Sequence, residues 1–124
     1  MLHFPSSSLN EALERVADED EKRAREVVAF YDDLNQSISN VACILRRGGH
    51  ACYVVGNRKV KGVVLLTSEV IRDFFLEYGM EHISTVTRSI PNKRMPSRNS
   101  PTNKLGMLDD TMTTEYIVVM RKDR

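Results

Sequence analysis

Apolar residues recur at helical spacing in the first half of the chain. Ser8, followed three residues later by Glu11, matches a capping box and predicts a short helix through about Val16. After the acidic run at 18–21, a second helix is predicted to end at the glycines 48–49. Its apolar positions follow i, i+3, i+4, i+7 spacing: Val27, Val28, Tyr31, Leu34, Ile38, Val41, Ala42 and Leu45. This spacing predicts one buried stripe along the helix.

The second half alternates strands with one more helix. Residues 51–55, ACYVV, are apolar without alternation, which is typical of a strand covered on both faces. Thr67 or Ser68 is predicted to cap a third helix that ends at Gly79 and buries Val70, Ile71, Phe74 and Phe75. The β-branched residues of 81–90 and the run EYIVVM at 115–120 predict two final strands. Since no helix separates these two strands, we expect them to pair antiparallel.

The predicted sheet is incomplete. A strand covered on both faces needs neighbours, and one crossover helix with one hairpin supplies too few of them. Two or more parallel strands before residue 1 would give a doubly wound α/β sheet with a terminal antiparallel hairpin. We therefore expect one edge of residues 51–55 to lack its parallel neighbour, and the isolated chain to self-associate or exchange elements with a second copy.

Composition narrows the class of protein. The chain has 124 residues, 41% hydrophobic and 28% charged, which fits one soluble globular domain. No apolar run reaches the ~20 residues of a membrane span, and the first residues lack the features of a signal peptide, so we expect a cytoplasmic protein without membrane contact. Cys43 and Cys52 form no metal or disulfide pattern and lie among apolar residues, which predicts two buried thiols.

Charge is unevenly distributed along the chain, although the net charge is only +1. Residues 1–45 hold nine acids and four bases, whereas residues 46–124 hold fourteen bases and eight acids. This segregation indicates a polyanionic partner on one side of the fold. A solvated surface is the alternative, and charge alone favours it.

The segment 91–113 is predicted to be a long basic loop. Prolines at 91, 96 and 101 exclude a helix or a central strand. No acid occurs between Glu81 and Asp109, and the bases here are Arg88, Lys93, Arg94, Arg98 and Lys104. These bases would contact phosphates, while the amides of Asn92, Asn99 and Asn103 suit base edges. A solvated surface linker is the alternative.

A second candidate site follows the strand at 51–55. Asn57, Arg58 and Lys59 come at its carboxyl end, where open α/β sheets gather their ligands. The amide of Asn57 offers donors and an acceptor, and the two cations suit a phosphate of an extruded nucleotide. A solvated turn is the alternative. The scattered histidines and the acidic run 18–21 match neither a nucleophile nor a metal site, so we predict no catalytic residue and no metal ligand in this chain.

The order helix, strand, helix, strand, strand resembles the carboxy-terminal half of the class I S-adenosylmethionine-dependent methyltransferase fold. LRRGGHACYVVGN resembles the stretch in which a helix ends at a double glycine and enters the fifth strand of that fold. RSIPNKRMPSRNSPTNKLGMLDDTMTTEYIVVMRK resembles the end of bacterial and archaeal site-specific DNA methylases that modify exocyclic amino groups. The resemblance covers about residues 22–122.

The resemblance implies a partial doubly wound sheet, with residues 1–124 as the carboxy-terminal half of a methyltransferase domain. It implies a part or subunit of a restriction-modification DNA methyltransferase acting on cytosine N4 or adenine N6. The chain lacks the Gly-rich loop and the Asp- or Ser-Pro-Pro-aromatic motif of such enzymes. We therefore expect S-adenosylmethionine to be bound mainly by a missing amino-terminal half or second subunit, and the chain to be inactive alone.

Two other functions fit the same residues. The basic loop alone would suit a non-catalytic nucleic-acid-binding module. The fold alone would suit a methyltransferase that acts on RNA or protein.

Overall fold

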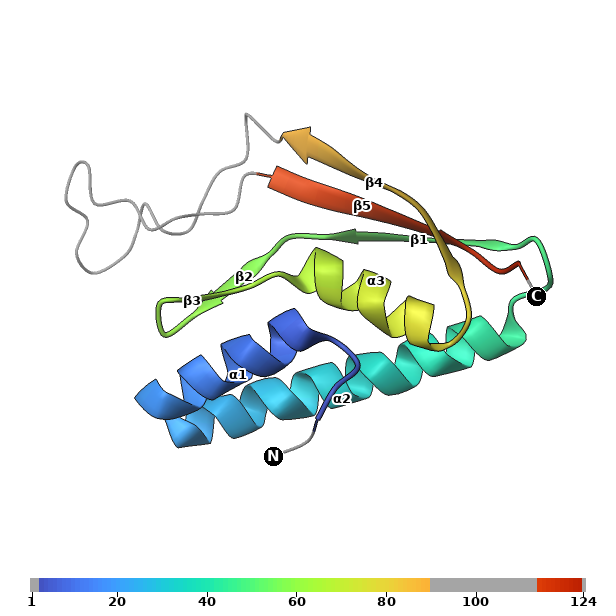
Figure 1. The fold of residues 1–124 in the computed structure, drawn as a ribbon. Helices are drawn as coiled ribbons and strands as arrows, with labels where there is room; N and C mark the ends of the chain where they lie inside the picture. Colours follow the sequence, from blue (N-terminus) through green and yellow to red (C-terminus); the bar gives the residue numbers. More distant parts are fainter. Residues whose placement is uncertain (1–2, 90–113, 124) are drawn as a thin grey trace.

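The computed structural model describes residues 3–89 and 114–123; most of the predicted basic loop lies outside this range. The elements in chain order are α1 Ser7–Glu19, α2 Glu21–Ile44, β1 His50–Val55, β2 Arg58–Val60, β3 Val63–Leu65, α3 Thr67–Glu77, β4 Glu81–Ser89 and β5 Thr114–Arg121 (Figure 1). This order confirms the predicted α/β sequence of elements and adds a small hairpin, β2–β3. No helix within these ranges is long and apolar enough to cross a membrane.

Strands β1, β5 and β4 form one sheet in that order. The predicted antiparallel pairing of the last two strands is confirmed, and β5 also pairs antiparallel with β1. Cys52 lies opposite Val119 on one face, and Tyr53 lies opposite Val118 on the other. No strand of the described chain pairs with the second edge of β1, as expected for a sheet that lacks a parallel neighbour.

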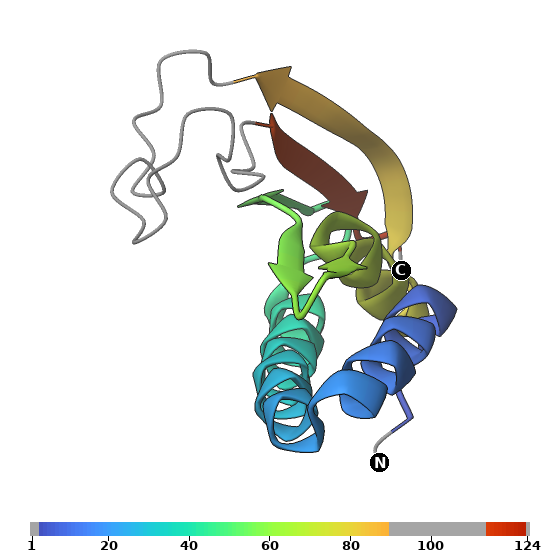
Figure 2. The same cartoon turned by 90° about the vertical axis from the view of Figure 1, so that its left-hand side faces the viewer.

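The helices lie on one side of this sheet (Figures 1 and 2). Helix α3 is packed between the sheet and the pair α1–α2. It buries Phe74 and Phe75 completely, as its spacing predicts. The Phe75 ring meets Tyr53 of β1 edge to face, with ring centroids 5.2 Å apart. Val118 and Met120 of β5 complete this interface from the sheet, so the core of the fold lies around α3.

The prediction that residues 51–55 are covered on both faces is wrong for this structure. Ala51 is buried under the helices, but Cys52 and Val54 point to the other face and are exposed. The prediction of two buried thiols is wrong as well, because Cys43 is exposed on α2. The physical reason for the exposure of Cys52 is that α2 and α3 both pack on the same side of the sheet (Figure 2).

Helix α1 begins earlier than predicted. Ser6 is its N-cap residue and Ser8 lies inside the first turn, so the predicted capping box at Ser8 is wrong. Phe4 is buried against Phe74, and the side chain of Asn10 bonds both the N–H and the C=O of Phe4. This anchored segment fixes the helix start, and the Ser6 hydroxyl donates to Asp73 at 2.8 Å instead of capping the helix.

The stretch after β1 forms a short hairpin, β2–β3. Val60, Val63 and Leu65 alternate inward and are buried. Lys61 and Gly62 both have positive φ, which matches a two-residue hairpin turn. The Lys61 ammonium lies 3.4 Å from the Asp20 carboxylate. Asp20 caps α2 by accepting from the Arg23 N–H, and this bond is the main cause that lowers its pKa.

Candidate functional site

A pocket of about 310 Å³ lies where the amino end of α3 meets the sheet. Its walls come from the segment after β1, from α3, and from the ends of β4 and β5 that flank residues 90–113. The lining residues are Asn57, Leu66, Ser68, Glu69, Arg72, Thr85, Thr87 and Tyr116. The pocket therefore opens beside the two points from which the predicted basic loop leaves the fold.

Asn57, which the sequence predicted as a site residue, lines this pocket and is buried, with 8% of its surface exposed. Its Oδ1 accepts from the backbone N–H and from the hydroxyl of Ser68, both at 3.3 Å. Ser68 stands in the first turn of α3, where backbone N–H groups lack helical partners. The Nδ2 of Asn57 donates no hydrogen bond to any described residue, so within this part of the chain its two N–H groups are not used.

Arg72 and Glu69 bring charge to the wall of the pocket. The Arg72 guanidinium donates to Asp73 Oδ1 through Nε at 3.3 Å and Nη2 at 3.2 Å. Asp73 in turn accepts from Ser6 at its other oxygen. Tyr116, Thr85 and Thr87 add hydroxyl groups from the sheet. This set of donors and acceptors suits a planar polar group that presents both kinds of partner, such as a nucleobase edge.

A buried pair of hydroxyls fixes the start of α3. Thr67 Oγ1 lies 2.8 Å from the Tyr31 hydroxyl, and either hydroxyl can donate in this bond; Thr67 Oγ1 also donates to the Leu65 carbonyl at 3.5 Å. Burial raises the pKa of Tyr31, and the Thr67 bond and the charge of Arg58 oppose this. The bond between Tyr31 and Thr67 joins α2 to the amino end of α3, whose first residues line the pocket.

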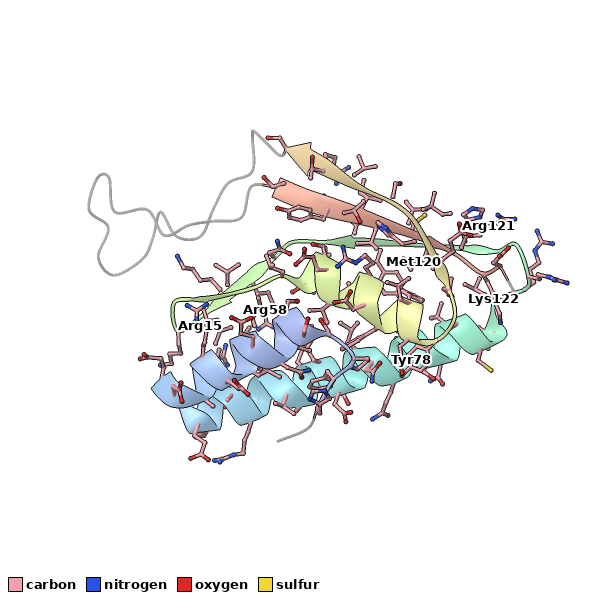
Figure 3. The ribbon with its side chains drawn as sticks, viewed as in Figure 1. Arg15, Arg58, Tyr78, Met120, Arg121 and Lys122 are labelled. Atoms are coloured by element: carbon pink, nitrogen blue, oxygen red, sulfur yellow. The ribbon has the colours of Figure 1, made fainter. Side chains whose placement is uncertain are left out.

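The other predicted site residues that the structure describes do not line the pocket with Asn57. Arg58 lies over the Phe30 ring of α2, 4.8 Å from its centroid (Figure 3). Arg88 of β4 is paired with Glu115 of β5 on the sheet face opposite the helices. Lys59 is exposed on β2. The remaining predicted contacts, Lys93, Arg94, Arg98, Asn99 and Asn103, lie outside the described residues.

Several lining residues were missed by the sequence interpretation. Thr85 and Thr87 alternate with period two directly before the basic segment, and that spacing places them on one face of β4. Glu69 and Arg72 are one helical turn apart in α3. The alternation of the threonines was a usable signal, whereas the contribution of Tyr116 depends on the position of β5 in the middle of the sheet.

Comparison with known proteins points to DNA methylases. No protein-family model matches the chain. The type II methyltransferase M.MvaI of Kocuria varians is 42% identical to it over 106 residues, which is 86% of this chain and 23% of that protein. The chain thus spans about a quarter of the curated relative that it matches.

Solved structures give the same result for the fold. A proposed DNA modification methylase from Thermus thermophilus matches with a TM-score of 0.59 and 25% identity, over 81% of this chain and 39% of that one. Its complex with S-adenosyl-L-methionine matches with the same TM-score, 20% identity and 40% coverage of that chain. The predicted resemblance to part of a DNA methyltransferase is confirmed, and the α/β architecture resembles part of a methylase fold.

Proposed function

We propose that the chain is part of a site-specific DNA methyltransferase that modifies an exocyclic amino group, cytosine N4 or adenine N6. The pocket around Asn57 carries this proposal. It presents amide donors that no described residue uses, beside the attachment points of a basic segment, in a chain related to a methyltransferase. Phosphate contacts from that segment would hold the DNA, and the pocket would receive polar edges of an extruded nucleotide.

In this proposal the chain forms only one part of such an enzyme. Its sequence holds neither a Gly-rich cofactor loop nor a Pro-Pro-aromatic motif, so S-adenosylmethionine and the reacting amine would be held mainly by another segment, an amino-terminal half or a second subunit. A parallel strand of that segment would pair with the free edge of β1 and extend the sheet into the doubly wound class I arrangement. Without it, the free edge of β1 favours self-association.

The proposal is tested by reconstitution. The second component is the M.MvaI polypeptide without the stretch that this chain matches, called below the complementary polypeptide. A mixture of the two should transfer methyl groups from S-adenosylmethionine to duplex DNA. The chain alone should neither bind the cofactor in calorimetry nor transfer methyl groups, because it lacks the cofactor loop.

Replacement of Asn57 by aspartate should lower methyl transfer by the mixture about tenfold. The aspartate keeps an acceptor for Ser68 but removes the Nδ2 donors, and the loss of one hydrogen bond to the reacting complex is worth about 1.4 kcal/mol. Asn40→Asp places the same charge on an exposed position of α2 and is the matched control. Equal rates for both variants would contradict a role for the amide in substrate binding.

Replacement of Arg94 and Arg98 together by alanine should weaken DNA binding by the mixture at every sequence. Each phosphate contact that is lost lowers the dependence of log K on log salt by about 0.9, so the slope should fall by about two units. Arg46→Ala with Arg47→Ala removes the same charge at the opposite end of β1 and should leave the slope unchanged. If the two double variants give one slope, the basic segment does not contact phosphates.

A further inference from the structure

The carboxylate of Asp73 holds two groups from different parts of the fold. Its Oδ1 accepts from Nε and Nη2 of Arg72, at 3.3 and 3.2 Å, and its Oδ2 accepts from the hydroxyl of Ser6 at 2.8 Å. Ser6 is only 3% exposed, and the segment before it is fixed by the burial of Phe4 against Phe74. Asp73 therefore links the buried start of α1 to a guanidinium at the wall of the pocket.

Both partners of Asp73 depart from a more usual local arrangement. Ser6 is the N-cap residue of α1, where a serine side chain ordinarily accepts from a backbone N–H of the first turn, but it makes no such bond. Arg72 pairs with its immediate neighbour, although residues three or four apart are the ones that face each other on a helix. Glu69, three residues before Arg72, makes no ion pair with any described residue. Departures from local rules that meet at one group are expected at functional sites.

The pairing with Asp73 leaves part of the Arg72 guanidinium unused within the described chain. A guanidinium has five N–H donors, and the two bonds to Asp73 come from Nε and Nη2. The Nη1 group donates to no described residue. Because Asp73 fixes the Nε edge of this planar group, the Nη1 donors are held in place before a ligand arrives.

The charges of the pocket favour a neutral ligand over a phosphate. Asp73 neutralises Arg72, and Glu69 adds one negative charge to the wall. A phosphate would meet the Glu69 carboxylate, and the described lining residues offer no second cation. A carbonyl oxygen or ring nitrogen of a nucleobase accepts from a guanidinium and carries no net charge. The base of an extruded nucleotide therefore suits this pocket better than its phosphate does.

We propose that Arg72 contacts an acceptor atom on the base of the extruded nucleotide, and that Asp73 and Ser6 are positioning residues that hold its guanidinium for this contact. The inference rests on the proposed function and specifies which part of the nucleotide enters the pocket. It adds one substrate-binding residue and two positioning residues to the site around Asn57.

Methyl transfer by the mixture of this chain with the complementary polypeptide measures the contact. Arg72→Lys keeps the charge but loses the fork that bonds Asp73 and the base together, so kcat/KM for duplex DNA should fall about 10–100-fold. Ser6→Ala removes the second bond to Asp73 and should lower kcat/KM about threefold to tenfold. Arg25→Lys and Ser7→Ala change exposed residues and are the matched controls, which should keep the activity of the original chain.

Chemical rescue separates positioning from a role in folding. Added ethylguanidinium should raise methyl transfer by the Arg72→Ala variant at least tenfold, because the free cation can occupy the place of the missing side chain. In the double variant with Asp73→Asn as well, nothing charged holds the added cation, and the rescue should be lost. A side chain that only stabilises the fold would show no rescue in either variant.

A titration of the chain alone tests the contact without the enzyme reaction. The probes are deoxycytidine, deoxyadenosine and deoxyribose 5-phosphate, and the readout is the NMR signal of the Asn57 side-chain amide. The chain should bind at least one of the two nucleosides with about millimolar affinity, and deoxyribose 5-phosphate should not shift the signal. Arg72→Gln should weaken nucleoside binding at least tenfold, whereas Arg25→Gln should not.

The outcomes separate this inference from the proposed function. Full methyl transfer by the Arg72→Lys mixture would overturn the inference and leave the function standing. A mixture without methyl transfer would count against the function, and the titration then decides the inference alone. No shift with either nucleoside, equal affinity of the Arg72→Gln chain, or binding of deoxyribose 5-phosphate would each overturn the inference.

Discussion

Replacement of Phe75 by alanine should lower the free energy of unfolding of the chain by about 3–5 kcal/mol. Phe75 is fully buried between α3 and the sheet, and its ring contacts Tyr53 edge to face. The substitution removes the ring contact and leaves a cavity that the neighbouring strands cannot fill. Since domains of this size are stable by only about 5–15 kcal/mol, the variant should lose a large part of its stability. Urea unfolding followed by circular dichroism measures the change.

Leu76→Ala is the matched control for this prediction. Leu76 is the next residue of the same helix but is 46% exposed, so its replacement should cost less than about 1 kcal/mol. Both variants should keep the slope of unfolding free energy against urea, because the surface exposed on unfolding hardly changes. Equal midpoints for the two variants would contradict the packing of α3 against the sheet.

The helices and the final hairpin could be predicted from the sequence because their signals are local. The spacing of Val70, Ile71, Phe74 and Phe75 identifies the buried face of α3 without knowledge of its partner. Two adjacent strands without a helix between them have to pair antiparallel. Gly79 directly follows the end of α3 and has positive φ, whereas α2 ends at Ile44, so the predicted helix end at the glycines 48–49 is wrong by a few residues.

The exposure of β1 could not be predicted because it depends on where the helices pack. The apolar run ACYVV indicates burial on both faces, and only the arrangement of α2 and α3 shows that both helices cover the same face. The hairpin β2–β3 was missed for a different reason. Its strands are three residues each, and Lys61 at positive φ is an uncommon turn residue.

The candidate site was predicted in part. Asn57, chosen because it follows the strand at 51–55, lines the pocket, and its environment is set by the adjacent start of α3; its role in binding stays a prediction. Arg58 follows it directly but alternates to the other side of the hairpin, where the Phe30 ring holds its guanidinium. The adjacent residues Asn57 and Arg58 therefore have different surroundings, and the run of three polar residues in the sequence does not show which of them lines the pocket.

The proposed function rests on the combination of an uncovered sheet face with a pocket at the end of the sheet. A binding module that is complete in itself would cover its apolar sheet face, whereas the described part of this chain leaves Val54 and Val86 exposed. A chain that forms only part of an enzyme would explain both the open face and the lack of a Gly-rich cofactor loop in the sequence. It also explains why the polar pocket lies beside the basic segment, since DNA would approach that end of the sheet.

Reconstituted methyl transfer is the prediction with the largest expected effect. If the proposed function holds, neither the chain nor the complementary polypeptide has all the parts of the enzyme, so each alone should give only background incorporation. Together they should restore transfer by orders of magnitude, because correct positioning of cofactor and target base supplies most of the acceleration.

The most direct measurement is the transfer of labelled methyl groups from S-adenosylmethionine to duplex DNA, followed by mass spectrometry of the digested nucleosides. The mixture should yield N4-methylcytosine or N6-methyladenine, and so should a chimaera in which this chain replaces the matched stretch of M.MvaI, whereas the chain alone should yield neither. Background incorporation by both the mixture and the chimaera, with each chimaera domain folded by circular dichroism, would contradict the account. Methyl transfer by the chain alone would contradict it equally.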